Sequence, residues 1–476
     1  MNKYKMLLGN IGLFGLNVFA TKIISFVLVP LYTYYLDTAD FGIQDMATLV
    51  ISMLSSLATL CIADGVLRFM IDDKRNARGY ASAGLIVMVV GCLIVMMLLP
   101  VTDLPIFGGL GNYKWLFLLY YAVGCFQNLF SMMARALSRL KVIAYASIAS
   151  SLVTAVGSGL FIAILHMGLT GFFYASILGG ATGALIYLIV GNLQGEFMWQ
   201  DKKLLRFCLK RMLPYSLPLI PNNILWLLNT SVNRFFITGI LGISASGMFA
   251  AASKIPNLLM MAYSIFQQAW TLSAFQEYRQ EGLSAFYAKV YRLLDALLCI
   301  CASAIIVLSE PLARLLLQKE FYNSWPLIPL LIAGLYFNIL GSFWGSIYTT
   351  FMKTREILTT TLLAALVSIV LTWGLIRVWQ LTGVAIALLV SNLVLWLTRV
   401  IGSRRLLTIK VKWKTSLLTY ALIAVQIAFG MFQVHEYLLM SVLVFIVVVC
   451  IQLWNIRPMM KQLVDIARQL VSGSCR

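Results

Sequence analysis

The sequence predicts an all-α polytopic membrane protein with fourteen transmembrane helices. Its 476 residues are 61% hydrophobic and only 11% charged, which leaves little for a soluble domain. Fourteen apolar stretches approach or exceed the roughly 20 residues that a helix needs to cross a bilayer core, and the Lys and Arg content of the intervening loops alternates. The stretches are residues 8–34, 43–67, 80–100, 114–134, 142–165, 168–192, 213–241, 246–270, 290–309, 325–350, 357–376, 382–401, 415–434 and 437–456.

The distribution of positive charge predicts the orientation of the helices. The two tails and every second loop contain 27 of the 36 Lys and Arg residues, whereas the opposite loops contain three, Arg314, Lys319 and Arg377. Because Lys and Arg concentrate in cytoplasmic loops, we expect both termini and 193–212 to be cytoplasmic and 310–324 to lie outside. The net charge of +19 is then explained by topology and by attraction to anionic lipid, and no nucleic-acid partner is expected.

A basic amphipathic stretch, residues 198–212, separates two groups of six predicted helices. We interpret 1–197 as an N-terminal lobe, 198–212 as a helix on the cytoplasmic surface that links the halves, and 213–405 as a C-terminal lobe. Residues 406–476 then hold helices 13 and 14 and a cytoplasmic tail.

A short internal repeat favours the same division. The first helix ends in LDTADFG (36–42) and the seventh in LGISASG (241–247), so each ends in Leu, five residues and Gly. Transporters are often built from such duplicated halves, with the substrate site between them.

Polar side chains inside the membrane gather in the first two helices of each half. A polar stripe on a transmembrane helix marks a face that avoids lipid. Asn222, Asn229 and Asn233 share one face of the seventh helix, which we interpret as the lining of a water-filled cavity. Asn17 and Gln268 lie on similar stripes of the first and eighth helices. Scattered Ser and Thr hydroxyls are interpreted as hydrogen bonds between helices.

Cations outnumber acids in these helices and suggest an anionic passenger, because Arg and Lys suit phosphate recognition. Lys22, Arg234 and Lys254 lie well inside their stretches, and Arg68 and Arg135 lie near inner ends. For Arg234 and Lys254 an equal alternative is that the side chains extend to the outer interface. For Arg135, ordinary topology charge is the favoured alternative.

The acids offer few candidates for chemistry. Asp45 and Asp64 are the only acids judged to lie at comparable depth, and Asp64 is the one considered for carrying a proton or Na+. Asp64 precedes Arg68 by four residues, so the alternative is a plain helix ion pair. The adjacent Asp72 and Asp73 lie in a Lys/Arg-rich loop and are interpreted as solvated charge. Without a P-loop or a metal-ligand spacing, we expect no catalytic residue, metal or cofactor.

Several stretches together resemble the oligosaccharide flippases, the Wzx-type proteins of the polysaccharide transport branch of the multidrug/oligosaccharidyl-lipid/polysaccharide exporter superfamily. They are PLYTYYLDTADFGIQD (30–45), GVLRFM (65–70), LPYSLPLIPNNILWLLNTSVNRFFI (213–237), SGMFAAASKIPNLL (246–259) and FQQAWTLSAF (266–275).

This resemblance implies two six-helix lobes in a V with two further helices, in the cytoplasmic membrane of a bacterium. It implies alternating-access transport of undecaprenyl-pyrophosphate-linked oligosaccharide for capsule, O-antigen or exopolysaccharide assembly, in company with polysaccharide polymerase and assembly proteins. The first two helices of each lobe line a cationic cavity in relatives. One departure is Asn233, which stands where the family usually has Asp before Arg234.

Three alternatives stay open. A lipid II flippase and a multidrug exporter belong to the same superfamily, although an exporter of cations should have an acidic interior. A membrane glycosyltransferase or polymerase needs a large outer loop, which the sequence lacks. For the driving force, we expect membrane potential rather than an ion, since pairing with Arg68 argues against titration of Asp64.

Overall fold

All regular secondary structure in the described part of the chain is helical. The computed structural model describes residues 21–198, 201–277, 282–351, 353–432 and 436–473. These form two compact units: one comprises the chain up to Ala251 with Leu316–Phe321, and the other comprises Ala252–Leu315 with Tyr322 onward. The first unit therefore extends beyond 198–212, where the sequence analysis divides the halves; the lobe boundaries stay a prediction.

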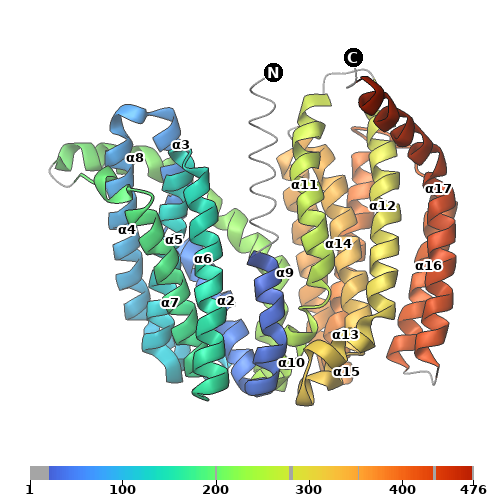
Figure 1. Cartoon of the computed structure of the whole chain (residues 1–476), viewed down its shortest axis with the longest axis horizontal. Helices are drawn as coiled ribbons and strands as arrows, with labels where there is room; N and C mark the ends of the chain where they lie inside the picture. Colours follow the sequence, from blue (N-terminus) through green and yellow to red (C-terminus); the bar gives the residue numbers. More distant parts are fainter. Residues whose placement is uncertain (1–20, 199–200, 278–281, 352, 433–435, 474–476) are drawn as a thin grey trace. The chain divides into compact units, whose positions relative to one another are not determined.

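The first unit is a helical bundle with a basic helix at one end (Figure 1). Residues 21–35 are helical. The helices that follow are α2 (Thr38–Ala58), α3 (Ile62–Asp72), α4 (Ala77–Leu98), α5 (Lys114–Ala136), α6 (Leu140–Ser158), α7 (Gly168–Ile189), α8 (Lys202–Ser216), α9 (Leu219–Leu241) and α10 (Ile243–Ala252).

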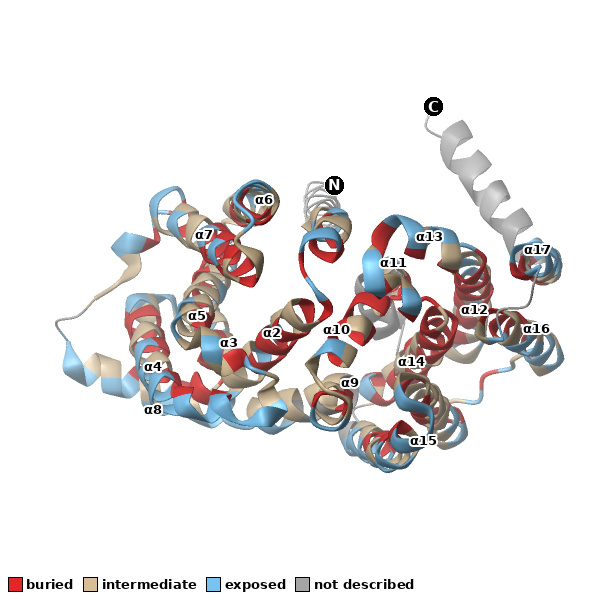
Figure 2. Cartoon of the chain, turned by 90° about the horizontal axis from the view of Figure 1, so that it is seen from below, coloured by how far each residue is buried: buried red, intermediate tan, exposed pale blue. Residues whose placement is uncertain are grey.

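The second unit is built around a buried central helix. Its helices are α11 (Asn257–Glu277), α12 (Leu283–Val307), α13 (Ser309–Leu316), α14 (Leu327–Thr350), α15 (Thr354–Ser403), α16 (Trp413–Met431) and α17 (Tyr437–Gly473). In the most apolar segment of α14, 78% of the residues are buried, against 33% in the corresponding segment of α16 and 22% in that of α17. Figure 2 shows the same contrast between α14 and α16. The core of this unit therefore lies around α14.

The described helices fit the fourteen predicted crossings. Ten candidate spans occur among the described residues, and one of them, Arg355–Ser403, is 49 residues long. This span contains non-helical backbone at Trp379 and Gln380, so it corresponds to the predicted stretches 357–376 and 382–401. The helical residues 21–35, α9 and α11 occupy the remaining predicted stretches. Outward-facing apolar side chains such as Trp115, 71% exposed, and Val370, 66% exposed, suit contact with lipid.

Two stretches that the sequence presents as continuous helices are broken. Stretch 43–67 is interrupted between α2 and α3, where Leu60 and Cys61 have φ values of 54° and 52° in the left-handed region. Stretch 246–270 is interrupted between α10 and α11. Pro256, directly before α11, has no backbone N–H to donate to the preceding helical turn. Hydropathy averaged over a whole stretch does not register such breaks, because each involves only a few residues.

Candidate functional site

Arg234 is held in an ion pair between α9 and α2. Its Nε donates to Oδ2 of Asp45 at 2.8 Å, and the side chains are only 15% and 20% exposed. The guanidinium also lies over the ring of Phe249 on α10, 4.6 Å from the ring centroid. Arg234 is therefore fixed against protein groups, which excludes the interpretation that it extends to the interface. The carboxylate partner comes from α2, and the neighbouring Asn233 is 2% exposed.

The two copies of the repeat contact each other next to this ion pair. α2 begins at Thr38 and α10 at Ile243, which hold the same place in the two motifs. A Cβ on Gly42 would lie 2.3 Å from the carbonyl oxygen of Ile243, and a Cβ on Gly247 would lie 1.9 Å from that of Thr38. Each glycine thus packs against the first residue of the other helix. This reciprocal contact is what a twofold relation between duplicated segments produces.

Three of the other four candidate cations lie in more exposed positions than Arg234. Lys22 and Arg135 are exposed, and Lys254, in the second unit, is partly buried. Arg68 is 59% exposed and pairs with Asp72 through Nε and Oδ2 at 3.1 Å. Lys22, Arg68 and Arg135 are all more exposed than Arg234, whose side chain is 15% exposed and paired with Asp45.

The structure corrects the expected pairing of Asp64. Arg68 contacts Asp72, one turn further along α3, rather than Asp64. The cation that acts electrostatically on Asp64 is Arg135 of α5. The prediction that Asp64 pairs with Arg68 and so does not titrate is therefore wrong in its pairing.

The candidate amides are only partly described. Asn17 lies outside the described residues. Asn222 and Asn229 in α9 and Gln268 in α11 have described backbone, but their side chains lie outside the described set. The predicted polar cavity lining stays a prediction.

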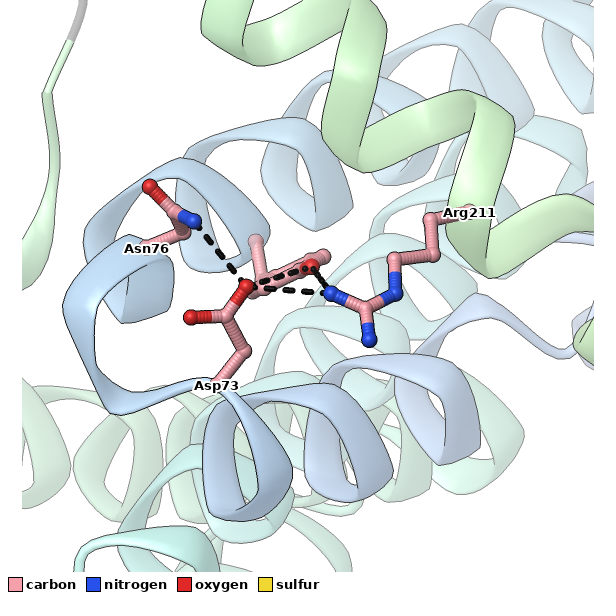
Figure 3. Close-up of polar contacts among 4 residues, drawn as sticks. Asp73, Asn76 and Arg211 are labelled. Carbon is pink, nitrogen blue, oxygen red and sulfur yellow. Dashed lines mark hydrogen bonds and ion pairs between the residues drawn. The ribbon is translucent and has the colours of Figure 1, made fainter.

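Asp73, interpreted from the sequence as solvated charge, is instead the centre of a polar cluster (Figure 3). Its Oδ2 accepts hydrogen bonds from Asn76 Nδ2 at 2.9 Å, Tyr80 Oη at 3.2 Å and an Arg211 guanidinium nitrogen at 3.1 Å. The same Arg211 nitrogen donates to the Tyr80 hydroxyl at 3.2 Å. The hydrogen bond from Asn76 is the largest cause that holds the pKa of the Asp73 carboxyl below its usual value. This cluster ties α8 to α3 and α4.

The apolar side of α8 packs on the same two helices. Cys208 and Met212 are fully buried, and a Cβ on Gly79 of α4 would lie 2.9 Å from the Cys208 sulfur. Burial raises the pKa of the Cys208 thiol to about 11. α8 therefore has a protein-facing side, whereas Phe207, 49% exposed, is directed away from it.

Replacing Arg211 by Ala is expected to loosen α8. We expect a loss of about 1 kcal/mol, because the bond is charge-assisted but Arg211 is half exposed. The lowered pKa of Asp73 means that its contribution is present above the pKa of an unfolded aspartate and is lost as the pH falls through the lowered value. The difference between wild type and Arg211→Ala should therefore shrink in acid. The measurements are thermal unfolding against pH and the rate of thiol modification at Cys208.

Arg206→Ala is the matched control, since Arg206 lies on α8 and is exposed. Equal modification rates at Cys208 in wild type, Arg206→Ala and Arg211→Ala would contradict the role given to the cluster.

Two buried charged residues in the second unit are not among the predicted site residues. Asp295 of α12 is 2% exposed and Arg399 of α15 is 7% exposed. The Arg399 guanidinium donates to the Thr360 and Thr361 hydroxyls and to the Gly341 carbonyl, at 3.0 to 3.2 Å. The statement that only Asp45 and Asp64 are deep acids is therefore wrong. The signal was available, since Asp295 lies inside the apolar stretch 290–309.

The sequence matches a family model described as polysaccharide biosynthesis protein over residues 7–272. No curated protein matches the chain.

Three solved structures show the fold that the chain shares. The lipid II flippase MurJ, in an inward closed conformation, has a TM-score of 0.69 at 14% identity, covering 94% of this chain and 99% of that one. An inward-facing multidrug resistance MATE family transporter of the MOP superfamily has a TM-score of 0.63 at 17% identity, covering 82% and 94%. A mutant of the Vibrio cholerae MATE transporter VcmN has a TM-score of 0.58 at 16% identity, covering 85% and 99%. The family match and the shared fold agree with the resemblance found in the sequence.

Proposed function

The chain belongs to the polysaccharide biosynthesis protein family, and from this premise we propose that it carries a lipid-linked oligosaccharide across the bacterial cytoplasmic membrane. The passenger we propose is an undecaprenyl-pyrophosphate-linked repeat unit for capsule, O-antigen or exopolysaccharide assembly. The observation that supports this most is the family match, which covers the polar helices of the first unit. The fold shared with a lipid flippase over 94% of the chain adds support for a carrier.

We place Arg234 at the pyrophosphate. A guanidinium binds phosphate through a planar fork of donors, and this one is oriented by Asp45 and by the ring of Phe249. Lys22, Arg68 and Lys254 add positive charge along the path, with Arg135 a weaker contributor. The lipid tail stays in the bilayer, where it is already well solvated.

The charge of the passenger also bears on the driving force. With the inside of the membrane negative, outward movement of an anion gains about 2.3 kcal/mol per elementary charge for each 100 mV. Membrane potential therefore assists transport. The alternative carriers differ in passenger: a lipid II flippase carries another lipid, and a multidrug exporter carries small molecules.

Reconstitution tests the passenger directly. Purified protein is placed in vesicles that contain undecaprenyl-pyrophosphate-linked oligosaccharide, and a membrane-impermeant lectin or glycosidase reports the saccharide that reaches the outer leaflet. We expect faster exposure of the saccharide than in protein-free vesicles, with a further increase when the potential favours outward movement of anions. Parallel vesicles contain lipid II or a fluorescent cationic drug. Transport of one of these without transport of the oligosaccharide would contradict the proposal.

A further inference from the structure

Asp295 lies in a hydrogen-bonded cluster that joins three helices of the second unit. Its Oδ1 accepts hydrogen bonds from the hydroxyls of Tyr336 on α14 and Tyr420 on α16, the latter at 2.9 Å. Its Oδ2 accepts a hydrogen bond from Ser416 on α16 at 2.8 Å. Next to it, the Cys299 thiol lies 3.2 Å from the Tyr336 hydroxyl. Three neutral hydroxyls thus surround one buried carboxyl group.

No described Lys, Arg or His forms an ion pair with Asp295. The contrast with Asp45 is direct, since Asp45 has Arg234 at 2.8 Å. An ionised carboxylate without a cation is costly inside a membrane protein. Three hydroxyl donors offset part of that cost. The cations Arg292, Lys410 and Lys412, which line a small cavity beside Asp295 without forming an ion pair with it, also favour the charged form. These opposing effects favour a group that gains and loses a proton.

A small cavity gives Asp295 a route for proton exchange. Its volume of about 10 Å³ is the space that one water molecule needs. Two polar atoms on its lining residues, the hydroxyl of Tyr291 and Oδ1 of Asn455, are buried and make no hydrogen bond to the described residues. A water molecule in this cavity would lie among Tyr291, Asn455 and Ser416.

Charged side chains place this cavity at one end of the unit. Arg292, Lys410 and Lys412 line it together with Asp295. Lys410 and Lys412 belong to loop 402–414, which the charge pattern predicts to be cytoplasmic. The charged and titratable groups around Asp295 are therefore Arg292, Tyr291 and Cys299 of α12, Tyr336 of α14, Tyr420 of α16, and the two lysines.

We propose that Asp295 is the proton-binding site of this carrier and couples transport to a proton gradient. The inference rests on the proposed carrier function but not on the identity of the passenger. In the uptake step, an excess proton reaches the cavity as hydronium and bonds to a carboxylate oxygen of Asp295, which leaves a neutral water molecule, and the hydroxyl that donated to that oxygen turns to another acceptor. Release reverses the step. Each exchange changes the hydrogen bonds that hold α12, α14 and α16 together.

A proton fits this site better than Na+ does. A metal ion needs several oxygen lone pairs directed at one point, whereas the hydroxyls of Tyr336, Tyr420 and Ser416 direct their protons at the carboxylate. Among the described residues, no group of three or more His, Cys, Asp or Glu side chains could hold a metal ion. The cavity has room for one water and not for a hydrated ion.

The first experiment measures proton binding without any passenger. Purified protein in weakly buffered nanodiscs is stepped in pH, and a pH-sensitive dye reports the protons taken up. We expect Asp295→Asn to take up one proton per molecule fewer than wild type. Asp64→Asn should still take up the proton that we assign to Asp295. Unchanged uptake in Asp295→Asn would overturn the proposal, whatever the passenger is.

A second variant keeps the test decisive if Asp295→Asn folds poorly. Tyr420→Phe retains the carboxylate but removes one donor to its charged form, so the midpoint of the uptake should move to higher pH. Tyr322→Phe, whose hydroxyl bonds Glu310 in the same unit, is the control and should leave the midpoint in place. An unmoved midpoint in Tyr420→Phe would assign Asp295 a structural role only and overturn the proposal.

The vesicle assay then tests coupling. At clamped zero potential, a pH gradient should accelerate flipping by wild type and lose that effect in Asp295→Asn. Acceleration by a Na+ gradient at equal pH, lost in the same variant, would overturn the assignment to a proton. If Asp295→Asn takes up one proton fewer than wild type but wild type does not flip the oligosaccharide, Asp295 is still the proton site and the proposed passenger is rejected.

Discussion

Replacing Arg234 by Ala should both destabilise the first unit and abolish export of polysaccharide. The change leaves the Asp45 carboxylate, which is only 20% exposed, without its cationic partner. Removing one partner of a buried pair costs about 3 kcal/mol. The variant also removes the guanidinium that we place at the pyrophosphate. Thermal unfolding of the purified protein and polymer export in a strain that lacks the chromosomal copy measure the two effects.

A second pair of variants separates stability from transport. In Asp45→Ala/Arg234→Ala no charge is left unpaired, so much of the lost stability should return while export stays absent. Arg234→Lys keeps the charge but not the planar fork, so it should restore export only in part. Wild-type export by the double variant would show that the pair only joins α2 to α9.

The crossings were predictable because they follow from average properties of long stretches. A helix through lipid needs apolar side chains over its whole length, and loop charge records which side each loop faces. The breaks at Leu60 and before Pro256 were not predicted, since one residue in an unusual backbone conformation hardly changes an average. The kink at Gln380, with φ of 47°, was found only because two apolar stretches bracket it.

The candidate site was predictable in its residue types but not in its pairings. Arg234 stands out as a cation in an apolar helix, yet its partner Asp45 is 189 residues away in the sequence. A sequence suggests partners only among close neighbours: for Arg68 it suggested Asp64, whereas the structure pairs Arg68 with Asp72. Asp295 was predictable as an acid inside the apolar stretch 290–309, but its partners were not, because they are hydroxyls from α14 and α16 that look like ordinary interhelical contacts.

The repeat gains meaning from the structure. In the sequence, LDTADFG and LGISASG share little beyond Leu and Gly. In the fold, Gly42 and Gly247 each face the first carbonyl of the opposite helix. The glycines are the shared feature because only a residue without Cβ permits two backbones to approach this closely.

This reciprocal packing leads to the second large expected effect. Gly247→Ala and Gly42→Ala would each place a methyl group against a carbonyl oxygen, at 1.9 Å and 2.3 Å, so α2 and α10 must move apart. Overpacking of this kind costs about 2 kcal/mol. Both variants should therefore unfold at lower temperature than wild type, and by similar amounts.

Gly239→Ala is the matched control for both variants. Gly239 lies in α9 with nothing within 4 Å of its Cβ position, so Ala there should be neutral or slightly stabilising. Similar decreases in unfolding temperature for Gly42→Ala and Gly247→Ala, with no decrease for Gly239→Ala, would mean that the two motifs contribute equally to one symmetric contact. A lower unfolding temperature in only one of the two variants would contradict the symmetric contact. In a twofold contact the two glycines have equivalent surroundings, so both substitutions must be destabilising.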